Sequence, residues 1–162
     1  MINKLIPNEY LEDIYQIDMA RLFKSGYRNL IMDIDNTIMP WNEYVITPKL
    51  VRWVNQTISM GFKICLLSNN NIQRAHSLAD KLGIMAASNR GKPLPRAFIS
   101  AINALQGTRR DTIVIGDQIF TDILGGNILG LYTILVDPIS PNEFFGTKIN
   151  RFMEKFIRRR IL

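Results

Sequence analysis

Short runs of apolar residues alternate along the chain with segments in which apolar positions recur every three or four residues. The apolar runs predict strands at 29–34, 62–67, 84–87, 111–115 and 132–136. The helical spacing predicts helices at 8–24, 47–60, 71–82, 95–105, 120–129 and 144–160. Strands that alternate with helices are typical of the α/β class, so we expect a parallel sheet with helices on both faces.

The composition fits one globular domain spanning residues 1–162. Hydrophobic residues make up 47% of the chain and charged residues 21%, which excludes a disordered protein. A length of 162 residues is too short for two ordinary domains. The single cysteine, Cys65, excludes an internal disulfide and fits a reducing compartment. The single histidine, His76, excludes a multi-histidine metal site and disfavours a Ser/His/Asp hydrolase.

The sequence predicts neither a membrane-spanning helix nor a secretion signal. No stretch approaches the ~18–20 apolar residues that a spanning helix needs. Residues 1–11 interleave polar and apolar side chains, so they lack the apolar core of a signal peptide. We therefore expect a cytoplasmic protein.

Positive charge concentrates at the C-terminal end of the chain. The net charge is +6, and residues 140–162 contain six Lys or Arg against two Glu. In the predicted helix at 144–160, an apolar stripe runs beside largely separate basic positions. This pattern suits a helix packed on the sheet with a solvated basic face. The alternative is a basic amphipathic helix on anionic lipid, which would place the protein peripherally at the inner membrane face.

Polar side chains follow three of the predicted strands at the point where each strand ends. Ligands of open α/β sheets bind outside the carboxyl ends of the strands, so these side chains are expected to share one site. A lysine in the loop after 84–87 joins them. The candidate site residues are Asp33, Asp35, Thr37, Ser68, Lys92, Asp117 and Asp122.

The residue types in this group indicate phosphoryl transfer. Carboxylates that converge without histidine or cysteine predict a site for Mg²⁺, which prefers oxygen ligands. Ser68 and Lys92 have no role in a purely structural magnesium site, but both can bind an anion. A metal, a lysine, a hydroxyl and a nearby carboxylate are together the groups that phosphoryl transfer uses.

The same residues resemble the four motifs of the haloacid dehalogenase (HAD) superfamily, in order. Asp-x-Asp-x-Thr runs from Asp33 to Thr37, the hydroxyl motif is Ser68, and the lysine motif is Lys92. The last motif, Gly-Asp-x-x-x-x-Asp, runs from Gly116 to Asp122. This resemblance implies a Rossmann-like fold and a phosphotransferase activity.

Further stretches are similar to the small YqeG-type phosphatases of class IIIA, along nearly the whole chain. They are Pro-Asn-Glu-Tyr at 7–10, Leu-Ser-Asn-Asn at 67–70, Gly-Gly-Asn at 125–127 and Gly-Leu-Tyr-Thr-Ile-Leu-Val at 130–136. Relatives of this family in mitochondria and plastids dephosphorylate phosphatidylglycerophosphate. The resemblance therefore implies a phosphorylated substrate, with a lipid-linked phosphate as the leading candidate.

The resemblance also implies a role for each motif residue. Asp33 would be the nucleophile that forms an aspartyl-phosphate, and Asp35 would protonate the leaving oxygen and then activate water. Mg²⁺ would be held by Asp33, the backbone carbonyl of Asp35, Asp117 and, directly or through water, Asp122. Ser68 and Lys92 would hold the oxygens of the transferring phosphoryl group.

The spacing between motifs leaves no room for the cap domain that many members of this superfamily carry. From Thr37 to Ser68, and from Ser68 to Lys92, the chain has only enough residues for helices, a strand and turns. We therefore expect an open site, which suits a large substrate such as a lipid phosphate. It also suits a soluble sugar or nucleotide phosphate if a second subunit covers the mouth.

A non-catalytic protein that binds RNA or ribosomes is the alternative from a different functional class. Its support is the positive net charge. It leaves the full set of acids unexplained. Nucleic-acid binding is further disfavoured because the aromatic residues of the basic segment fall on its apolar stripe rather than among the charges.

Overall fold

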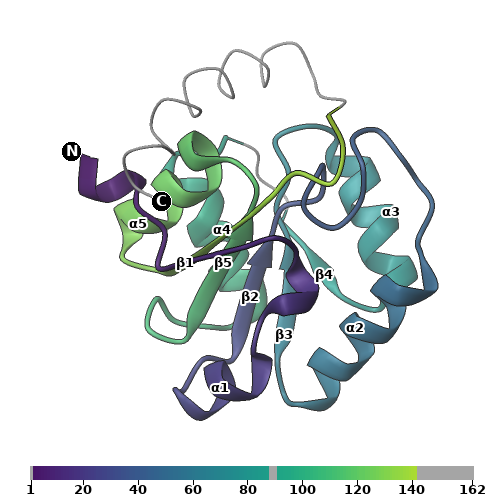
Figure 1. Cartoon of the computed structure of the whole chain (residues 1–162), viewed down its shortest axis with the longest axis horizontal. Helices are drawn as coiled ribbons and strands as arrows, with labels where there is room; N and C mark the ends of the chain where they lie inside the picture. Colours follow the sequence, from purple (N-terminus) through teal and green to yellow (C-terminus); the bar gives the residue numbers. More distant parts are fainter. Residues whose placement is uncertain (1, 88–90, 142–162) are drawn as a thin grey trace.

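A computed structural model describes residues 2–87 and 91–141 of the chain. Six strands form a single sheet in the order β1-β6-β5-β2-β3-β4, and every neighbouring pair is parallel (Figure 1). The strands are β1 (Glu9–Leu11), β2 (Asn29–Met32), β3 (Lys63–Leu66), β4 (Met85–Ala86), β5 (Thr112–Gly116) and β6 (Tyr132–Val136). The predicted parallel α/β sheet is confirmed.

Helices connect the strands and cover both faces of the sheet. The α-helices are α1 (Met19–Lys24), α2 (Pro48–Ser59), α3 (Ile72–Leu82), α4 (Pro95–Leu105) and α5 (Leu124–Leu129). Two 3₁₀ turns, Ile2–Leu5 and Ile14–Gln16, lie near the N-terminus, and a π-helical turn, Ile119–Ile123, leads into α5.

The two largest hydrophobic clusters lie on opposite faces of the sheet. Alternate residues of a strand point to opposite faces. In β2, Leu30 and Met32 pack with α1, α2 and α3, whereas Ile31 packs with α4 and the end of α5. All four residues of β2 are buried, since this strand lies inside the sheet between β3 and β5.

The predicted helix over 8–24 is wrong, because this segment divides into a strand, a 3₁₀ turn and the short helix α1. Backbone pairing with β6 draws residues 9–11 into the sheet as its edge strand. In the rest of the segment, two aspartates each begin a separate helical turn. The Asp13 carboxylate accepts hydrogen bonds from two backbone N–H groups of the 3₁₀ turn, and Asp18 caps α1 through Arg21 N–H at 2.9 Å. The predicted helix at 144–160 lies outside the described residues.

The connections between the motifs are short, as the spacing predicts. Between β2 and β3 the chain forms a loop and α2, and after β3 the described residues form α3 and β4. No separate cap domain is formed by the described parts of the chain, residues 2–87 and 91–141. Within the same residues, no helix combines the length and apolar character needed to cross a membrane.

Candidate active site

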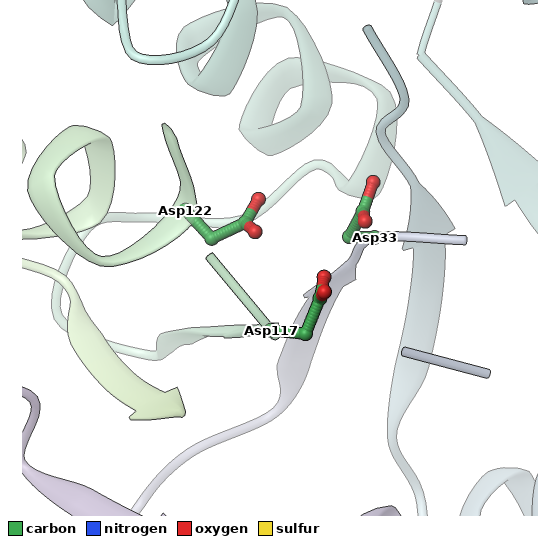
Figure 2. A group of neighbouring side chains, drawn as sticks. All are labelled: Asp33, Asp117 and Asp122. Carbon is green, nitrogen blue, oxygen red and sulfur yellow. The ribbon is translucent and has the colours of Figure 1, made fainter. Parts of the chain in front are cut away.

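Three aspartates meet at the carboxyl edge of the sheet. Asp33 directly follows β2 and Asp117 directly follows β5, and these two strands pair side by side with Met32 opposite Ile115. The π-helical turn brings Asp122 back toward them. Each carboxylate offers an oxygen within 4.8 Å of the other two, and all three residues are buried (Figure 2).

Lys92 joins two of these carboxylates. Its Nζ donates to Oδ1 of Asp33 at 2.6 Å and to Oδ1 of Asp122 at 2.7 Å. Asn69 fixes the backbone that carries this lysine, because its Oδ1 accepts from the N–H groups of Gly91 and Lys92 while its Nδ2 donates to the Lys92 carbonyl. The sequence analysis gave Asn69 no role beside this lysine, so the bracing by its side chain is a structural finding.

The burial of these charges shifts their pKa values. Removal from water raises the pKa of Asp33 to about 6, since the attraction of Lys92 offsets only part of that penalty and Asp122 adds repulsion. Burial alone would lower the pKa of Lys92, but Asp122 and Asp33 outweigh it and raise that pKa above its ordinary value. Lys92 is therefore an ammonium at every physiological pH.

The charges of this site suit a divalent cation. When ionised, the three aspartates and Lys92 together carry a net charge of −2 in a buried place. Buried charges are stable only when they are paired or bound to a metal. The donors are carboxylate oxygens, which Mg²⁺ prefers, so Asp33, Asp117 and Asp122 fit the predicted ion.

Two hydroxyl residues lie at the same edge. Thr37 donates from Oγ1 to Oδ1 of Asp117 at 3.0 Å, so it orients that carboxylate. Ser68 follows the strand β3 next to β2 and is buried, and its Oγ accepts the N–H of Asn70 at 3.1 Å. The predicted motif residues therefore come to neighbouring strand ends.

Asp35 is separate from the three clustered carboxylates. Its Oδ1 accepts from Nη1 of Arg74 at 2.6 Å and from the N–H of Asn42 at 3.2 Å. The sequence analysis did not identify Arg74. The sequence marks Arg74 only as a charged residue on the side of α3 that also carries Leu78 and Leu82, and this does not reveal its partner.

Comparison with known proteins agrees with this geometry. The family model for haloacid dehalogenase-like hydrolases matches residues 8–130. The chain belongs to this family. It is 36% identical over 152 residues to a probable phosphatase, YqeG, of Bacillus subtilis, covering 94% of the chain and 88% of that protein. The superfamily and the relation to YqeG-type phosphatases that the motifs predicted are confirmed.

More distant relatives are consistent with this assignment. The chain is 26% identical to phosphatidylglycerophosphate phosphatase 1 of Arabidopsis thaliana, over 96% of the chain but only 48% of that longer protein. The solved structure of a predicted HAD-like family hydrolase from Porphyromonas gingivalis superposes with a TM-score of 0.55 at 12% identity, covering 79% of this chain and 98% of that one. This likeness concerns the fold, and the catalytic roles of individual residues stay predictions.

Proposed function

We propose that the protein is a Mg²⁺-dependent phosphomonoesterase that works through an aspartyl-phosphate on Asp33. The observation that carries this proposal is the buried Asp33 carboxylate, 2.6 Å from the Lys92 ammonium and grouped with Asp117 and Asp122. Nucleophilic attack on a phosphate uses a carboxylate as nucleophile, with an ammonium and a metal ion nearby to offset the negative charge of the phosphoryl oxygens.

The proposed reaction has two steps. An oxygen of Asp33 attacks phosphorus while the bond from phosphorus to the leaving oxygen breaks, and Asp35 gives that oxygen its proton. Asp35 then takes a proton from water, which attacks the aspartyl-phosphate and releases inorganic phosphate. Lys92 and Ser68 would bind the phosphoryl oxygens. Mg²⁺, held by Asp33, Asp117, Asp122 and the carbonyl of Asp35, would supply positive charge that favours the dianionic substrate.

Replacement of Asp33 by Asn tests the nucleophile. Asparagine has the same shape but cannot form the acyl-phosphate, so hydrolysis of an aryl phosphate with Mg²⁺ should fall by at least about a thousandfold. The fold should survive, which circular dichroism would show. Residual turnover within about tenfold of the wild type would exclude Asp33 as the nucleophile.

A second measurement tests the metal. Chelation should abolish activity and added Mg²⁺ should restore it, because the donor set consists of hard oxygen ligands. Calorimetry should detect Mg²⁺ binding to the wild type and a strong loss of affinity in Asp117→Ala. Unchanged affinity in that variant would place the metal elsewhere.

The proposed substrate is a lipid-linked phosphate such as phosphatidylglycerophosphate. The similarity to the phosphatidylglycerophosphate phosphatase of Arabidopsis supports this choice, as does the lack of a cap in the described residues. Large apolar side chains are also exposed in loops on the side of the sheet where its strands end. They are Tyr44, Val45, Leu94 and Ile139, which are 62%, 70%, 50% and 49% exposed. Exposed apolar side chains at this edge would suit an amphiphilic substrate better than a small sugar phosphate.

The basic C-terminal segment would bring the protein to anionic lipid. The described chain reaches this segment beside the first motif, because Ile139 N–H donates to the Asn36 carbonyl and Ser140 N–H to Asn36 Oδ1. Near an anionic surface each basic residue contributes about 1 kcal/mol. Replacing Arg158, Arg159 and Arg160 with Gln should therefore weaken vesicle binding by roughly a hundredfold.

A substrate panel separates the two enzymatic alternatives. Phosphatidylglycerophosphate in mixed micelles is compared with soluble sugar and nucleotide phosphates, using wild type and the triple Gln variant. We expect the lipid substrate to be preferred, and its turnover alone to fall in the variant. Preference for a soluble phosphate, or equal vesicle binding by both proteins, would favour the soluble-substrate alternative.

A further inference from the structure

A charged side chain lies buried on the apolar side of α3. Arg74 is 7% exposed and shares this side with Leu78 and Leu82. Burial of a guanidinium is unfavourable unless it is paired and hydrogen-bonded. Its backbone is also held, since its N–H donates to Oδ1 of the N-cap residue Asn71 at 3.1 Å. Arg74 therefore extends from a fixed point toward specific partners.

Those partners lie in the loop that carries Asp35 and in the segment that follows it. Nη1 donates to Oδ1 of Asp35 at 2.6 Å, and Nη2 donates to the carbonyl of Glu43 at 2.6 Å. Nη2 also lies 3.3 Å from Sδ of Met39. Nε is buried without a hydrogen-bond partner among the described residues, which costs about 1–3 kcal/mol. The guanidinium is thus oriented toward Asp35 and Glu43, although this orientation leaves its Nε–H without a hydrogen bond among the described residues.

As a result, the two carboxylate oxygens of Asp35 have different hydrogen-bond partners. Oδ1 receives both the Arg74 bond and the Asn42 N–H at 3.2 Å. Within the described residues, Oδ2 accepts a longer hydrogen bond, from Nδ2 of Asn70 at 3.4 Å. Oδ2 is therefore the oxygen that can carry a transferable proton. The Asp35 side chain is 13% exposed against 5% for Asp33, so it lies on the more open side.

We propose that Arg74 is a positioning residue that holds Asp35 so that Oδ2 transfers the proton. This inference rests on the proposed phosphatase function. As Asp33 bonds to phosphorus and the leaving oxygen departs, that oxygen takes the proton from Oδ2, and Oδ2 later takes one from the attacking water. Arg74 touches none of these reacting atoms. Without it the carboxylate would rotate among orientations that cannot transfer a proton, while phosphoryl binding would persist.

The leaving group provides the test, because an alkoxide needs a proton to depart and a nitrophenolate hardly does. The values of kcat/KM, which report the first chemical step, are measured for glycerol phosphate and p-nitrophenyl phosphate. Arg74→Met should lower the value for glycerol phosphate by about 10- to 100-fold and that for the aryl phosphate by less than about threefold. Arg74→Lys, which keeps the charge without the two-pronged donor, should fall between wild type and Arg74→Met.

Arg28 provides a matched control. Its Nη1 donates to the carbonyls of Phe23 and Tyr27 at 2.7 and 2.6 Å, and its guanidinium lies 3.7 Å from the centre of the Phe23 ring. Arg28→Met therefore removes a similar number of bonds without touching Asp35. Both Met variants should lower the unfolding temperature, but Arg28→Met should leave kcat/KM for both phosphates within about twofold of the wild type.

A double variant decides whether Arg74 acts through Asp35. In an Asp35→Asn background, Arg74→Met should lower kcat/KM for glycerol phosphate by less than a further twofold or so. Equal losses on both phosphates, or a full additional loss in that background, would overturn the positioning role. Failure of the proposed function would give a different result. Either the wild type would hydrolyse neither phosphate, or Asp33→Asn would keep its activity. In both cases the inference about Arg74 would fail as well.

Discussion

Gly116 is the position at which a single methyl group should disable the site. It is the last residue of β5 and precedes Asp117. A Cβ at Gly116 would lie 2.3 Å from Cγ of Asp122 and 2.4 Å from its Oδ2, whereas ordinary contact begins at 3.4 Å. Its φ is outside the left-handed region, so Gly116→Ala introduces this clash without backbone strain.

The size of the clash sets the expected effect. The Asp122 carboxylate would have to move by about 1 Å, the difference between 2.3 and 3.4 Å. That shift would break its 2.7 Å bond with Lys92 and its 3.2 Å bond with the N–H of Gln118. A displacement of about 1 Å at a catalytic site costs roughly a hundredfold in rate, and overpacking costs about 1–3 kcal/mol of stability. Mg²⁺ affinity should fall by about tenfold or more.

Gly126→Ala is the matched control for this prediction. A Cβ there would lie 2.6 Å from Cγ2 of Thr133 and 3.1 Å from Cγ2 of Val114, so it overpacks the sheet rather than the carboxylates. Urea unfolding should show a loss of stability in both variants, whereas calorimetry and aryl phosphate hydrolysis should detect a loss of function only in Gly116→Ala. Wild-type Mg²⁺ affinity and rate in Gly116→Ala would refute the assignment of Asp122 to the metal site.

Two further predictions concern buried groups. Lys92→Met removes the cation between Asp33 and Asp122, so at pH 8 without metal the free energy of unfolding should drop by about 3–5 kcal/mol. Urea titrations should show that added Mg²⁺ recovers much of this loss, and no recovery would contradict a metal at these carboxylates. Burial raises the pKa of the Cys65 thiol to about 12, and only the thiolate reacts. At pH 8, maleimide should therefore label Cys65 in urea but not in the folded protein, and rapid labelling of the folded protein would contradict this.

The α/β class and the meeting of the acidic residues follow from the amino-acid sequence alone. Asp33 and Asp117 are attached directly to the ends of β2 and β5. Once two apolar runs are recognised as neighbouring parallel strands, the positions of the residues that follow them are nearly fixed. The carboxylate cluster could thus be predicted because each member depends on local sequence plus one general rule of sheet geometry.

Features that depend on partners distant in the sequence become visible only in the folded chain. Residues 9–11 have enough apolar character for a helix, but the edge of β6 more than 120 residues away provides backbone partners and makes them a strand. Arg74 is polar in a helical pattern, and its importance appears only when folding brings it to Asp35, 39 residues earlier. Asn69 likewise gains its role by reaching Lys92, 23 residues later. Local patterns cannot encode such contacts, because hydrogen bonds between distant segments depend on how the whole chain packs.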